Sequence, residues 1–300
     1  MVPGYDAANV RKGLWAAAIG GLLFTLDLPL LRLAGLDLWT LVFGRGLFLF
    51  VSILAGWILL RRKSGERRPF IAGKAGVATA IATTLAPITY ISAIANTSAA
   101  NVVFLVALIP LMTAVFSRVF LGEKARWITW AAILAALAGV TIIVSGSFGT
   151  GQLFGDVMAF ASALCTAIAF TIMRASPNHM ATSLAAGSLL SAIVALAFFG
   201  ATPSALGHLS AFGQPAWLWL GLDGFVAIPI ALTLAATSPK FLPSTDVSMF
   251  FLLETVLTPV WIWLLNGEVP THRALLGGLL IVATLCIHSF WRLKSTMRTG

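Results

Sequence analysis

The feature that most constrains this chain is a series of long apolar runs separated by short polar breaks. A run of about 20 apolar residues is long enough to cross the ~30 Å hydrocarbon core of a membrane as an α-helix. Only 10% of the residues are charged, against about 25% in a typical soluble domain. The sequence therefore predicts an all-α polytopic membrane protein with ten transmembrane helices. The ten segments are Gly13–Ala34, Leu38–Leu60, Lys74–Ala95, Ser98–Leu121, Arg126–Ser145, Leu153–Arg174, Ala181–Gly200, Ala216–Thr237, Pro243–Leu265 and His272–Trp291.

Basic residues indicate how these segments are oriented. Nearly all lysines and arginines lie near the termini or in breaks on one side of the predicted membrane, and only Arg32 and Arg273 fall on the other side. Cytoplasmic loops carry such an excess of positive charge, so both termini are expected in the cytoplasm. On a soluble chain the formal net charge of +9 would suggest binding to nucleic acid. Here membrane topology explains it, and the expected partner is the lipid bilayer rather than nucleic acid.

The two halves of the sequence resemble each other. Val119–Gly139 aligns with Leu264–Thr284, which divides the chain into a unit of residues 1–148 and a unit of residues 149–300. Each unit holds five predicted helices. Because five is odd, the second unit enters the membrane in the opposite orientation to the first. Such inverted-topology repeats are found in many secondary transporters, with the substrate site near the membrane midplane between the repeats.

The fourth and ninth predicted helices end in a shared pattern, Ile109–Glu123 (IPLMTAVFSRVFLGE) and Glu254–Glu268 (ETVLTPVWIWLLNGE). Together with ten helices in an inverted five-plus-five repeat, this pattern resembles the drug/metabolite transporter (DMT) superfamily, EamA type. The second copy differs in having Thr255 where the first has Pro110, its proline being Pro259 instead.

This resemblance implies a secondary transporter in the bacterial inner membrane that exports small organic solutes by alternating access. Within the superfamily the chain is most similar to YddG-type exporters, which implies aromatic or other neutral amino acids as the substrates. Another metabolite or a drug-like cation is the alternative. Small residues in the fifth and tenth helices allow close packing either within one chain or with a second copy, so a monomer and a homodimer both stay open.

Three charged residues lie inside predicted helices at one depth. Arg45 is seven residues into the second helix, Asp27 is seven residues before the end of the first, and Asp223 is seven residues into the eighth. Charges inside a membrane are costly unless they face one another or a water-filled cavity. Arg45 could bind a carboxylate group, and Asp27 or Asp223 an ammonium group, as an amino acid requires. The alternatives are an internal ion pair without a substrate role, and an Arg45 that snorkels to the surface.

Two further residues are candidates for the same substrate-binding site. Glu254 lies near the middle of the ninth helix, where loss of hydration favours the neutral acid. It could couple transport to protons or bind substrate, or it could only form a structural bond with Thr255 or Thr258. Tyr90, near the outer end of the third helix, could stack on an aromatic ligand or bond a carboxylate. An aromatic anchor at the membrane surface is the alternative for Tyr90.

Prolines mark positions at which the helices can bend, because a proline frees a backbone carbonyl group. The candidate hinges are Pro29, Pro87, Pro110, Pro229 and Pro259. Pro87 and Pro229 align in the repeat, which makes them the best candidates for paired hinges. Asn101 and Asp246 also align, at the starts of the fourth and ninth helices, as helix caps would.

Other classes of protein receive less support. The sequence contains no H-E-x-x-H, G-x-S-x-G or P-loop motif, and its two cysteines imply neither a metal site nor a disulfide framework. No enzyme activity, catalytic residue, metal or cofactor is therefore expected. Asp27 and Asp223 lie at similar depth, as an intramembrane aspartyl protease would require, but the pattern expected around each aspartate is missing. A channel would need a selectivity ring or a re-entrant loop, and the sequence shows no sign of one.

Overall fold

The structure, a computed structural model, describes residues 7–64, 71, 73–122, 127–176, 180–199, 215–237 and 244–296. The regular structure in these residues is helical. In chain order the helices are α1 (Ala7–Phe24), α2 (Asp27–Ala34), α3 (Leu38–Ser64), α4 (Gly73–Asn96), α5 (Ala99–Val106), α6 (Ile109–Leu121), α7 (Trp127–Ser145), α8 (Leu153–Ala175), α9 (Ala181–Phe199), α11 (Pro215–Gly221), the π-helix η1 (Leu222–Ala227), α12 (Ile228–Thr237), α13 (Ser244–Asn266) and α14 (His272–Thr296).

The helices follow the predicted segments closely. The first, fourth and eighth segments are each divided, whereas every other segment forms one helix. Within the described ranges, five stretches are long and apolar enough to cross a membrane: Leu38–Leu59, Gly73–Asn96, Ala99–Leu121, Leu153–Met173 and Pro215–Leu234. The chain thus has the helical, strongly apolar architecture of a polytopic membrane protein. That all ten segments cross the bilayer, and that the two halves are inverted, remain predictions.

The break between α1 and α2 has a covalent cause. Pro29 lacks the N–H group that would bond the carbonyl group of Thr25 in a continuous helix, and the helix turns at Thr25 and Leu26. The hydroxyl of Thr258, in α13, donates to this free carbonyl oxygen at 3.1 Å. A hydrogen bond to another helix therefore replaces the one that proline removes, as membrane-buried backbone requires.

The other two divided segments also contain a proline just after the irregularity. The α5–α6 break at Ala107 and Leu108 precedes Pro110, which lies in the first turn of α6. In the eighth segment the N–H of Ile228 bonds the carbonyl of Asp223, five residues back. Pro229 then cannot donate to the next carbonyl in the π pattern, that of Gly224.

The remaining two candidate hinges have different surroundings. Pro87 lies inside the continuous helix α4 and Pro259 inside the continuous helix α13. The aligned pair Pro87 and Pro229 therefore differs in local structure, since only Pro229 follows a π-helix. Pro29, Pro110 and Pro229 lie at irregular backbone, and a hinge role for any of the five stays a prediction.

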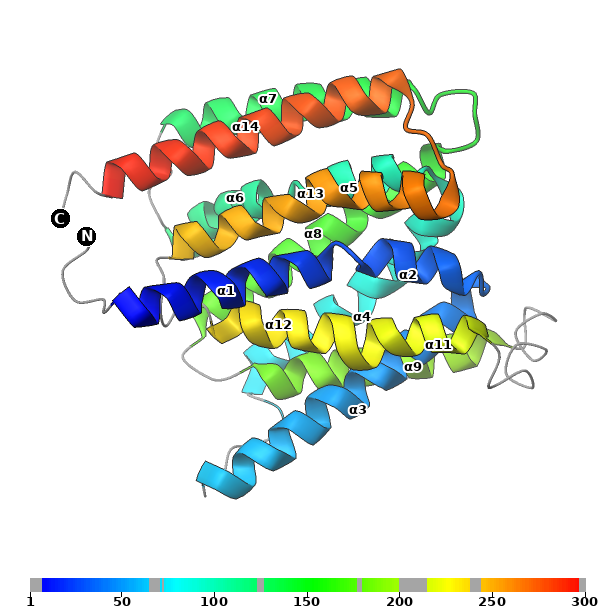
Figure 1. Ribbon diagram of the computed structural model, residues 1–300, viewed down its shortest axis with the longest axis vertical. Helices are drawn as coiled ribbons and strands as arrows, with labels where there is room; N and C mark the ends of the chain where they lie inside the picture. The colour runs from blue at the N-terminus through cyan, green and yellow to red at the C-terminus, as the bar shows by residue number, and fades with distance from the viewer. Residues whose placement is uncertain are drawn as a thin grey trace.

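Figure 1 shows the helices side by side, with their long axes roughly aligned. The start of α1 and the end of α14 lie at one end of the bundle, which we call the terminal end. The turns α2–α3 and α13–α14 lie at the opposite end, the far end. The most extensive helix pairings are α4 with α8, α3 with α9 and α7 with α14. Pairs that are distant in sequence thus hold the bundle together.

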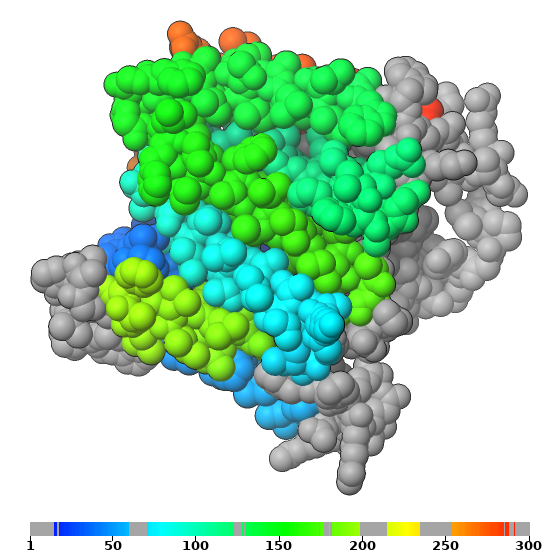
Figure 2. Space-filling model, turned by 180° about the vertical axis from the view of Figure 1, so that it is seen from behind, coloured from blue at the N-terminus to red at the C-terminus, as the bar shows by residue number. Residues whose placement is uncertain are grey.

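The outer surface of the bundle is apolar. Figure 2 shows a face formed by α4, α7, α8 and α9. Large hydrophobic side chains are exposed on these helices, among them Ile81, Leu134, Phe154 and Ile193. Exposed large apolar side chains of this kind suit acyl chains and not water.

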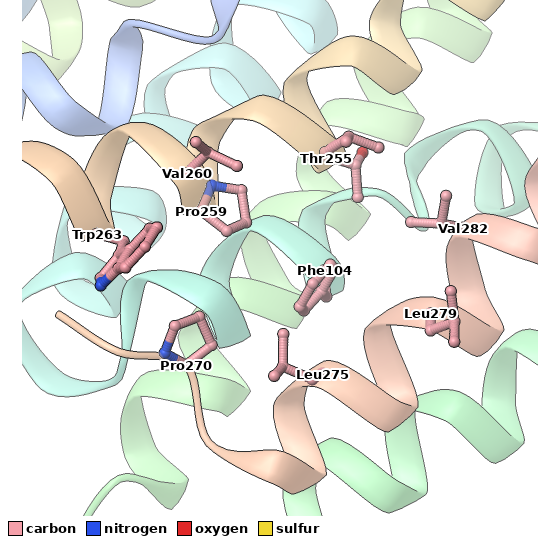
Figure 3. Close-up of a pocket in the computed structure, with 10 residues that line it drawn as sticks. Phe104, Thr255, Pro259, Val260, Trp263, Pro270, Leu275, Leu279 and Val282 are labelled. Atoms are coloured by element: carbon pink, nitrogen blue, oxygen red, sulfur yellow. The ribbon is translucent and has the colours of Figure 1, made fainter.

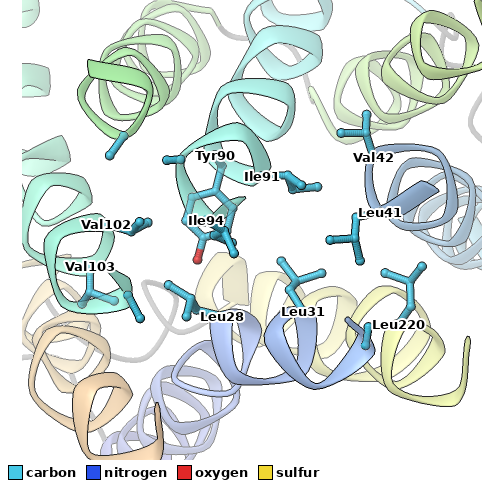
Figure 4. Close-up of a cluster of buried hydrophobic side chains, with 14 of the residues drawn as sticks. Leu28, Leu31, Leu41, Val42, Tyr90, Ile91, Ile94, Val102, Val103 and Leu220 are labelled. Atoms are coloured by element: carbon cyan, nitrogen blue, oxygen red, sulfur yellow. The ribbon is translucent and has the colours of Figure 1, made fainter. Parts of the chain in front are cut away.

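A buried hydrophobic cluster lies where α2, α3, α4 and α5 meet. Leu28, Leu31, Val42 and Ile91 are each at most 1% exposed. In Figure 4 the Tyr90 side chain points toward Leu28 of α2, while Val42 lies on the far side of the cluster, on α3. Burying each such side chain contributes about 1.5–3 kcal/mol in water-based accounting; inside a bilayer the comparable gain comes from close packing. The cluster fixes the short helix α2 and the ring of Tyr90 in place.

The packing of α14 on α7 generates a prediction. A Cβ atom at Gly277 would lie 2.5 Å from the carbonyl oxygen of Gly139 and 2.7 Å from Cγ1 of Ile143. We expect Gly277→Leu to push the two helices apart and lower the melting temperature in detergent, at the ~1–3 kcal/mol typical of overpacking. Gly56→Leu in α3 is the matched control, because no atom lies within 4 Å of a Cβ there. Equal melting temperatures for the two variants would contradict this packing.

Candidate functional site

Arg45 and Asp27 form a buried ion pair. Arg45 lies in α3, Asp27 is the first residue of α2, and the two residues are 8% and 7% exposed. Nη2 of Arg45 lies 2.8 Å from both carboxylate oxygens of Asp27. Hydrogen bonds between ionised groups are roughly twice as strong as those between neutral groups. The N-terminus of α2 adds to the stabilisation, since the helix dipole favours a negative charge at this position.

Asp223 approaches the same guanidinium group from the π-helix η1. It is fully buried, and its Oδ2 lies 3.2 Å from Nε of Arg45. The two groups are close enough for an ion pair, but the contact is not aligned as a hydrogen bond. Within the part of the chain that the structure describes, neither carboxylate oxygen of Asp223 has a hydrogen-bond partner. Asp27 and Asp223 are therefore unequal partners of Arg45.

Glycines on both sides of Arg45 let neighbouring helices set its position. A Cβ at Gly46 would lie 2.6 Å from the carbonyl oxygen of Ser188, in α9. A Cβ at Gly44 would lie 3.1 Å from the ring of Trp217, in α11, with Leu220 closer still. The two glycines thus allow α9 and α11 to pack closely against α3 on either side of Arg45.

Tyr90 lies next to this ion cluster, and Glu254 lies farther from it. Cζ of Arg45 is 5.4 Å from the centre of the Tyr90 ring, within the range of a cation–π interaction. Tyr90 is only 8% exposed, so a role as an anchor at the membrane surface does not fit its position. Glu254, in α13, is half-buried and near enough to Asp27 and Arg45 to interact with them electrostatically.

Of the five residues predicted for the site, the structure brings Asp27, Arg45, Tyr90 and Asp223 into contact, and Glu254 lies farther away in α13. We call Asp27, Arg45, Tyr90, Asp223 and Glu254 the central cluster. Arg45 is paired and buried, so it does not snorkel. An ionised side chain near the middle of a bilayer costs about 2.5–3.5 kcal/mol on insertion scales. Pairing offsets this cost for Arg45 and one carboxylate, but the single guanidinium charge cannot neutralise both Asp27 and Asp223.

The α1–α2 break ties the central cluster to α13. Thr25, in the break, is fully buried; its carbonyl accepts from Thr258 and its hydroxyl oxygen accepts from Nε1 of Trp261 at 3.1 Å. Asp27 lies two residues beyond. A movement of α13 would therefore be transmitted to Asp27, and nothing in the sequence alone indicates these two bonds.

A second buried polar cluster lies near the far end, and sequence reasoning missed it. Asp156, in the first turn of α8, is 1% exposed and accepts hydrogen bonds from the hydroxyls of Thr97 and Ser147. The side-chain amide of Asn101 donates to Asp156 at 3.0 Å. Asn101 is therefore not the helix cap expected from its position; Ser98 caps α5 by accepting from the Asn101 N–H. The side chain of Asp246, its aligned partner, lies outside the described residues.

An ion pair joins helices at the far end of the bundle. Nη2 of Arg32, at the end of α2, lies 3.6 Å from Oε2 of Glu268, in the α13–α14 turn. The same nitrogen donates to the carbonyl of Thr97 at 2.9 Å, and Glu268 accepts from the N–H of Ala99 at 2.6 Å. The end of α2, the α13–α14 turn and the α4–α5 junction therefore meet at these two side chains. Glu123, the residue aligned with Glu268, lies outside the described residues.

An apolar groove lies between α13 and α14, apart from the central cluster. Figure 3 shows Val260 and Trp263 of α13, Leu275 and Leu279 of α14, and Phe104 at its base. Its lining supplies no charged group for a polar solute, so the central cluster is the better candidate site. Among the described residues, no three His, Cys, Asp or Glu side chains lie close enough together to hold a metal ion.

Long apolar helices, a lipid-compatible surface and buried charges between helices together define a membrane transport protein. The profile of the EamA-like transporter family matches residues 11–145 and, a second time, residues 153–290. The chain therefore belongs to the EamA-like transporter family. Its members carry small solutes across membranes and are not, in general, enzymes.

Individual relatives are more distant. The protein described as "Uncharacterized transporter sll1164" of Synechocystis sp. is 22% identical over 213 residues, which is 66% of this chain and 60% of that protein. The match thus spans less than two thirds of the relative's length. A protein of known crystal structure shares the fold with a TM-score of 0.61 and 19% identity, over 95% of this chain and 98% of the other.

The unequal pairing of Arg45 generates a stability prediction. Arg45→Met leaves two buried carboxyl groups without their cation, and removing one partner of a buried ion pair typically costs about 3–5 kcal/mol. Asp223→Asn leaves the Arg45–Asp27 pair intact, so we expect little loss. Melting temperatures in detergent should therefore fall much further for Arg45→Met than for Asp223→Asn. The double variant Arg45→Met/Asp27→Asn should recover part of the lost melting temperature. If Asp223→Asn had the lowest melting temperature of the three variants, the assignment of Asp27 as the main partner of Arg45 would be contradicted.

Proposed function

We propose that this protein is a secondary transporter that exports small organic solutes, with aromatic and other neutral amino acids as the first class to test. It lies in the bacterial inner membrane with both termini in the cytoplasm, and it works by alternating access. The central cluster binds the solute. The single observation that carries this proposal is the meeting of Arg45 with Asp27 and Asp223 inside an apolar bundle.

The chemistry of the central cluster fits an amino acid. A guanidinium group binds a carboxylate in a defined geometry, and a carboxylate binds an ammonium group. The cluster holds both kinds of group side by side, since the guanidinium of Arg45 lies 2.8 Å from the carboxylate of Asp27 and 3.2 Å from that of Asp223. Tyr90 and the apolar cluster around it offer surface to a hydrophobic side chain. These features support a zwitterion with an apolar substituent.

Alternating access is supported by the contacts at the far end of the bundle. The Arg32–Glu268 pair and the Asp156 cluster both lie toward the far end of the bundle from the central cluster. We therefore interpret the far end as closed in this conformation. The α1–α2 break and the π-helix η1 supply Asp27 and Asp223 to the central cluster. Irregular helices of this kind surround the substrate site in many transporters.

An organic cation is the second candidate substrate. The carboxyl groups of Asp27, Asp223 and Glu254 outnumber the one guanidinium group of Arg45, so the cluster as a whole favours positive charge. An intramembrane protease is less well supported, because Arg45 already engages both oxygens of Asp27.

Transport by purified protein in liposomes tests the proposed function. We expect radiolabelled neutral amino acids to accumulate by counterflow, saturably, and Arg45→Lys to reduce the rate at least tenfold because a lysine cannot keep both carboxylate contacts. Arg273→Lys is the matched control, since this arginine lies at the far end and donates to the backbone carbonyl of Ser145. Absence of counterflow for every amino acid, with uptake of an organic amine, would favour the second candidate.

The far-end closure generates its own prediction. A cysteine at Ile94, which lies between Tyr90 and Thr97 in α4 and is 3% exposed, reports access in a chain whose own two cysteines are replaced. We expect Glu268→Gln to increase its modification by a membrane-impermeant thiol reagent, because the Arg32 contact and the charge at the Ala99 N–H are weakened. Arg273→Gln is the control at the same end. Unchanged modification in Glu268→Gln would contradict a closing role for this ion pair.

A further inference from the structure

The central cluster has more carboxyl groups than its surroundings can neutralise. Arg45 contributes one positive charge, and Asp27 and Asp223 would contribute two negative charges if both were ionised. Glu254, in α13, adds a third carboxyl group at greater distance, and Tyr90 is neutral. A net charge enclosed by apolar helices is costly, so the substrate-free cluster needs a bound proton or another cation.

The two aspartates differ in a way that decides where this proton lies. Asp27 receives both hydrogen bonds of Arg45 Nη2 and sits at a helix N-terminus, where the helix dipole favours a negative charge. Asp223 is 0% exposed, and neither of its oxygens has a hydrogen-bond partner in the described residues. Its contact with Arg45 runs through Nε and is not aligned as a hydrogen bond. An ionised carboxylate would lack the donors that normally stabilise it.

The groups that face Asp223 from the neighbouring helices support the same assignment. Arg45 from α3 and Asp27 from α2 are the charged groups that act on it most directly. The negative charge of Asp27 opposes a second negative charge nearby, as in pairs of carboxyl groups that share one proton. The positive charge of Arg45 acts in the opposite direction but is already engaged by Asp27. Tyr90 and Glu254 add no positive charge.

We propose that Asp223 carries a bound proton in the substrate-free transporter and is the residue at which protons and the positive group of the solute compete. Asp27 is the counterion of Arg45 in this substrate-free state. The π-helix places this carboxyl group in the cluster while freeing the carbonyl of Gly224, which the hydroxyl of Ser52 approaches at 3.4 Å. The backbone of the π-helix thus has a hydrogen-bond partner in α3, whereas the side-chain oxygens of Asp223 have none among the described residues.

A charge balance then gives the proton stoichiometry, a step that rests on the proposed function. When an organic monocation binds, Asp223 gives up its proton to water and its carboxylate pairs with the ammonium group, so one proton leaves for each cation bound. When a zwitterionic amino acid binds, its carboxylate takes Arg45 and its ammonium group takes Asp223. The proton then moves to Asp27, and the cluster stays neutral without net proton release.

Dicyclohexylcarbodiimide tests the bound proton without any knowledge of the solute. The O–H of a protonated carboxylic acid adds across one C=N bond of this apolar reagent, and the adduct rearranges to a stable N-acylurea with no leaving group. We expect mass spectrometry of the transporter in liposomes to find the adduct on the peptide that contains Asp223, less of it as the pH is raised, and none in Asp223→Asn. Asp156 is the internal control, because it is equally buried but both its oxygens accept hydrogen bonds.

The labelling experiment has outcomes that would overturn the proposal. Modification confined to Asp27 or to Glu254 would place the proton elsewhere. The same would follow from an unmodified Asp223 at every pH, or from an Asp156 modified as readily as Asp223. A melting temperature close to that of the natural sequence shows that Asp223→Asn is folded, so its loss of labelling cannot be ascribed to unfolding.

Two solutes with the same aromatic group separate this proposal from the proposed function. In weakly buffered detergent solution with a pH indicator, phenethylamine should release one proton for each molecule bound, phenylalanine none, and Asp223→Asn none with either. Equal release from Asp223→Asn and the natural sequence would overturn the role of Asp223. Failure of phenylalanine to bind, with Asp223 still modified by the carbodiimide, would contradict the amino-acid substrate and leave the bound proton established.

Discussion

A positive charge enclosed by apolar helices must be matched by a negative one, and the centre of this protein is arranged around that requirement. Arg45 reaches its carboxylates only because three local irregularities occur at the same level. Gly44 and Gly46 let two helices close on α3, Pro29 ends α1 so that Asp27 begins a new helix, and a π-helix carries Asp223. Each irregularity weakens a regular helix. Together they place opposite charges in contact, which straight helices with larger residues at these positions would keep apart.

Much of this arrangement could be predicted from the sequence, and the reason is geometric. Helix rise is uniform, so counting residues from the ends of the apolar runs placed Asp27, Arg45 and Asp223 at one depth, and the ion pairs confirm that they meet. Rotation about each helix axis is set by packing between distant segments and could not be counted. For that reason the unequal roles of Asp27 and Asp223 were not predicted. Asp156 was overlooked because an acid in the first turn of a helix has an ordinary local explanation.

The helix breaks show how tertiary context decides what a proline does. Pro29 and Pro229 each remove a hydrogen bond, and in both places a hydroxyl from another helix lies near a carbonyl that is left free, Thr258 at 3.1 Å and Ser52 at 3.4 Å. Pro87 and Pro259 lie in helices that continue through them. The aligned segments of the two halves thus differ in shape, although their sequences are related. If the two halves form two gates, they must differ in shape whenever one gate is closed and the other is open.

The two buried polar clusters differ in whether their carboxylate oxygens have hydrogen-bond donors, and this difference distinguishes a structural role from a functional one. Around Asp156 every carboxylate oxygen accepts a hydrogen bond, from Thr97 and Asn101 on one side and from Ser147 on the other. Such a cluster is complete and gains nothing from a ligand. Around Asp223 the oxygens are buried without donors, an arrangement that costs free energy in the absence of a proton or a ligand. A protein selected only for stability would replace that carboxyl group with an amide or an apolar side chain. Its presence beside a guanidinium group already neutralised by Asp27 therefore points to a group whose charge changes during the transport cycle.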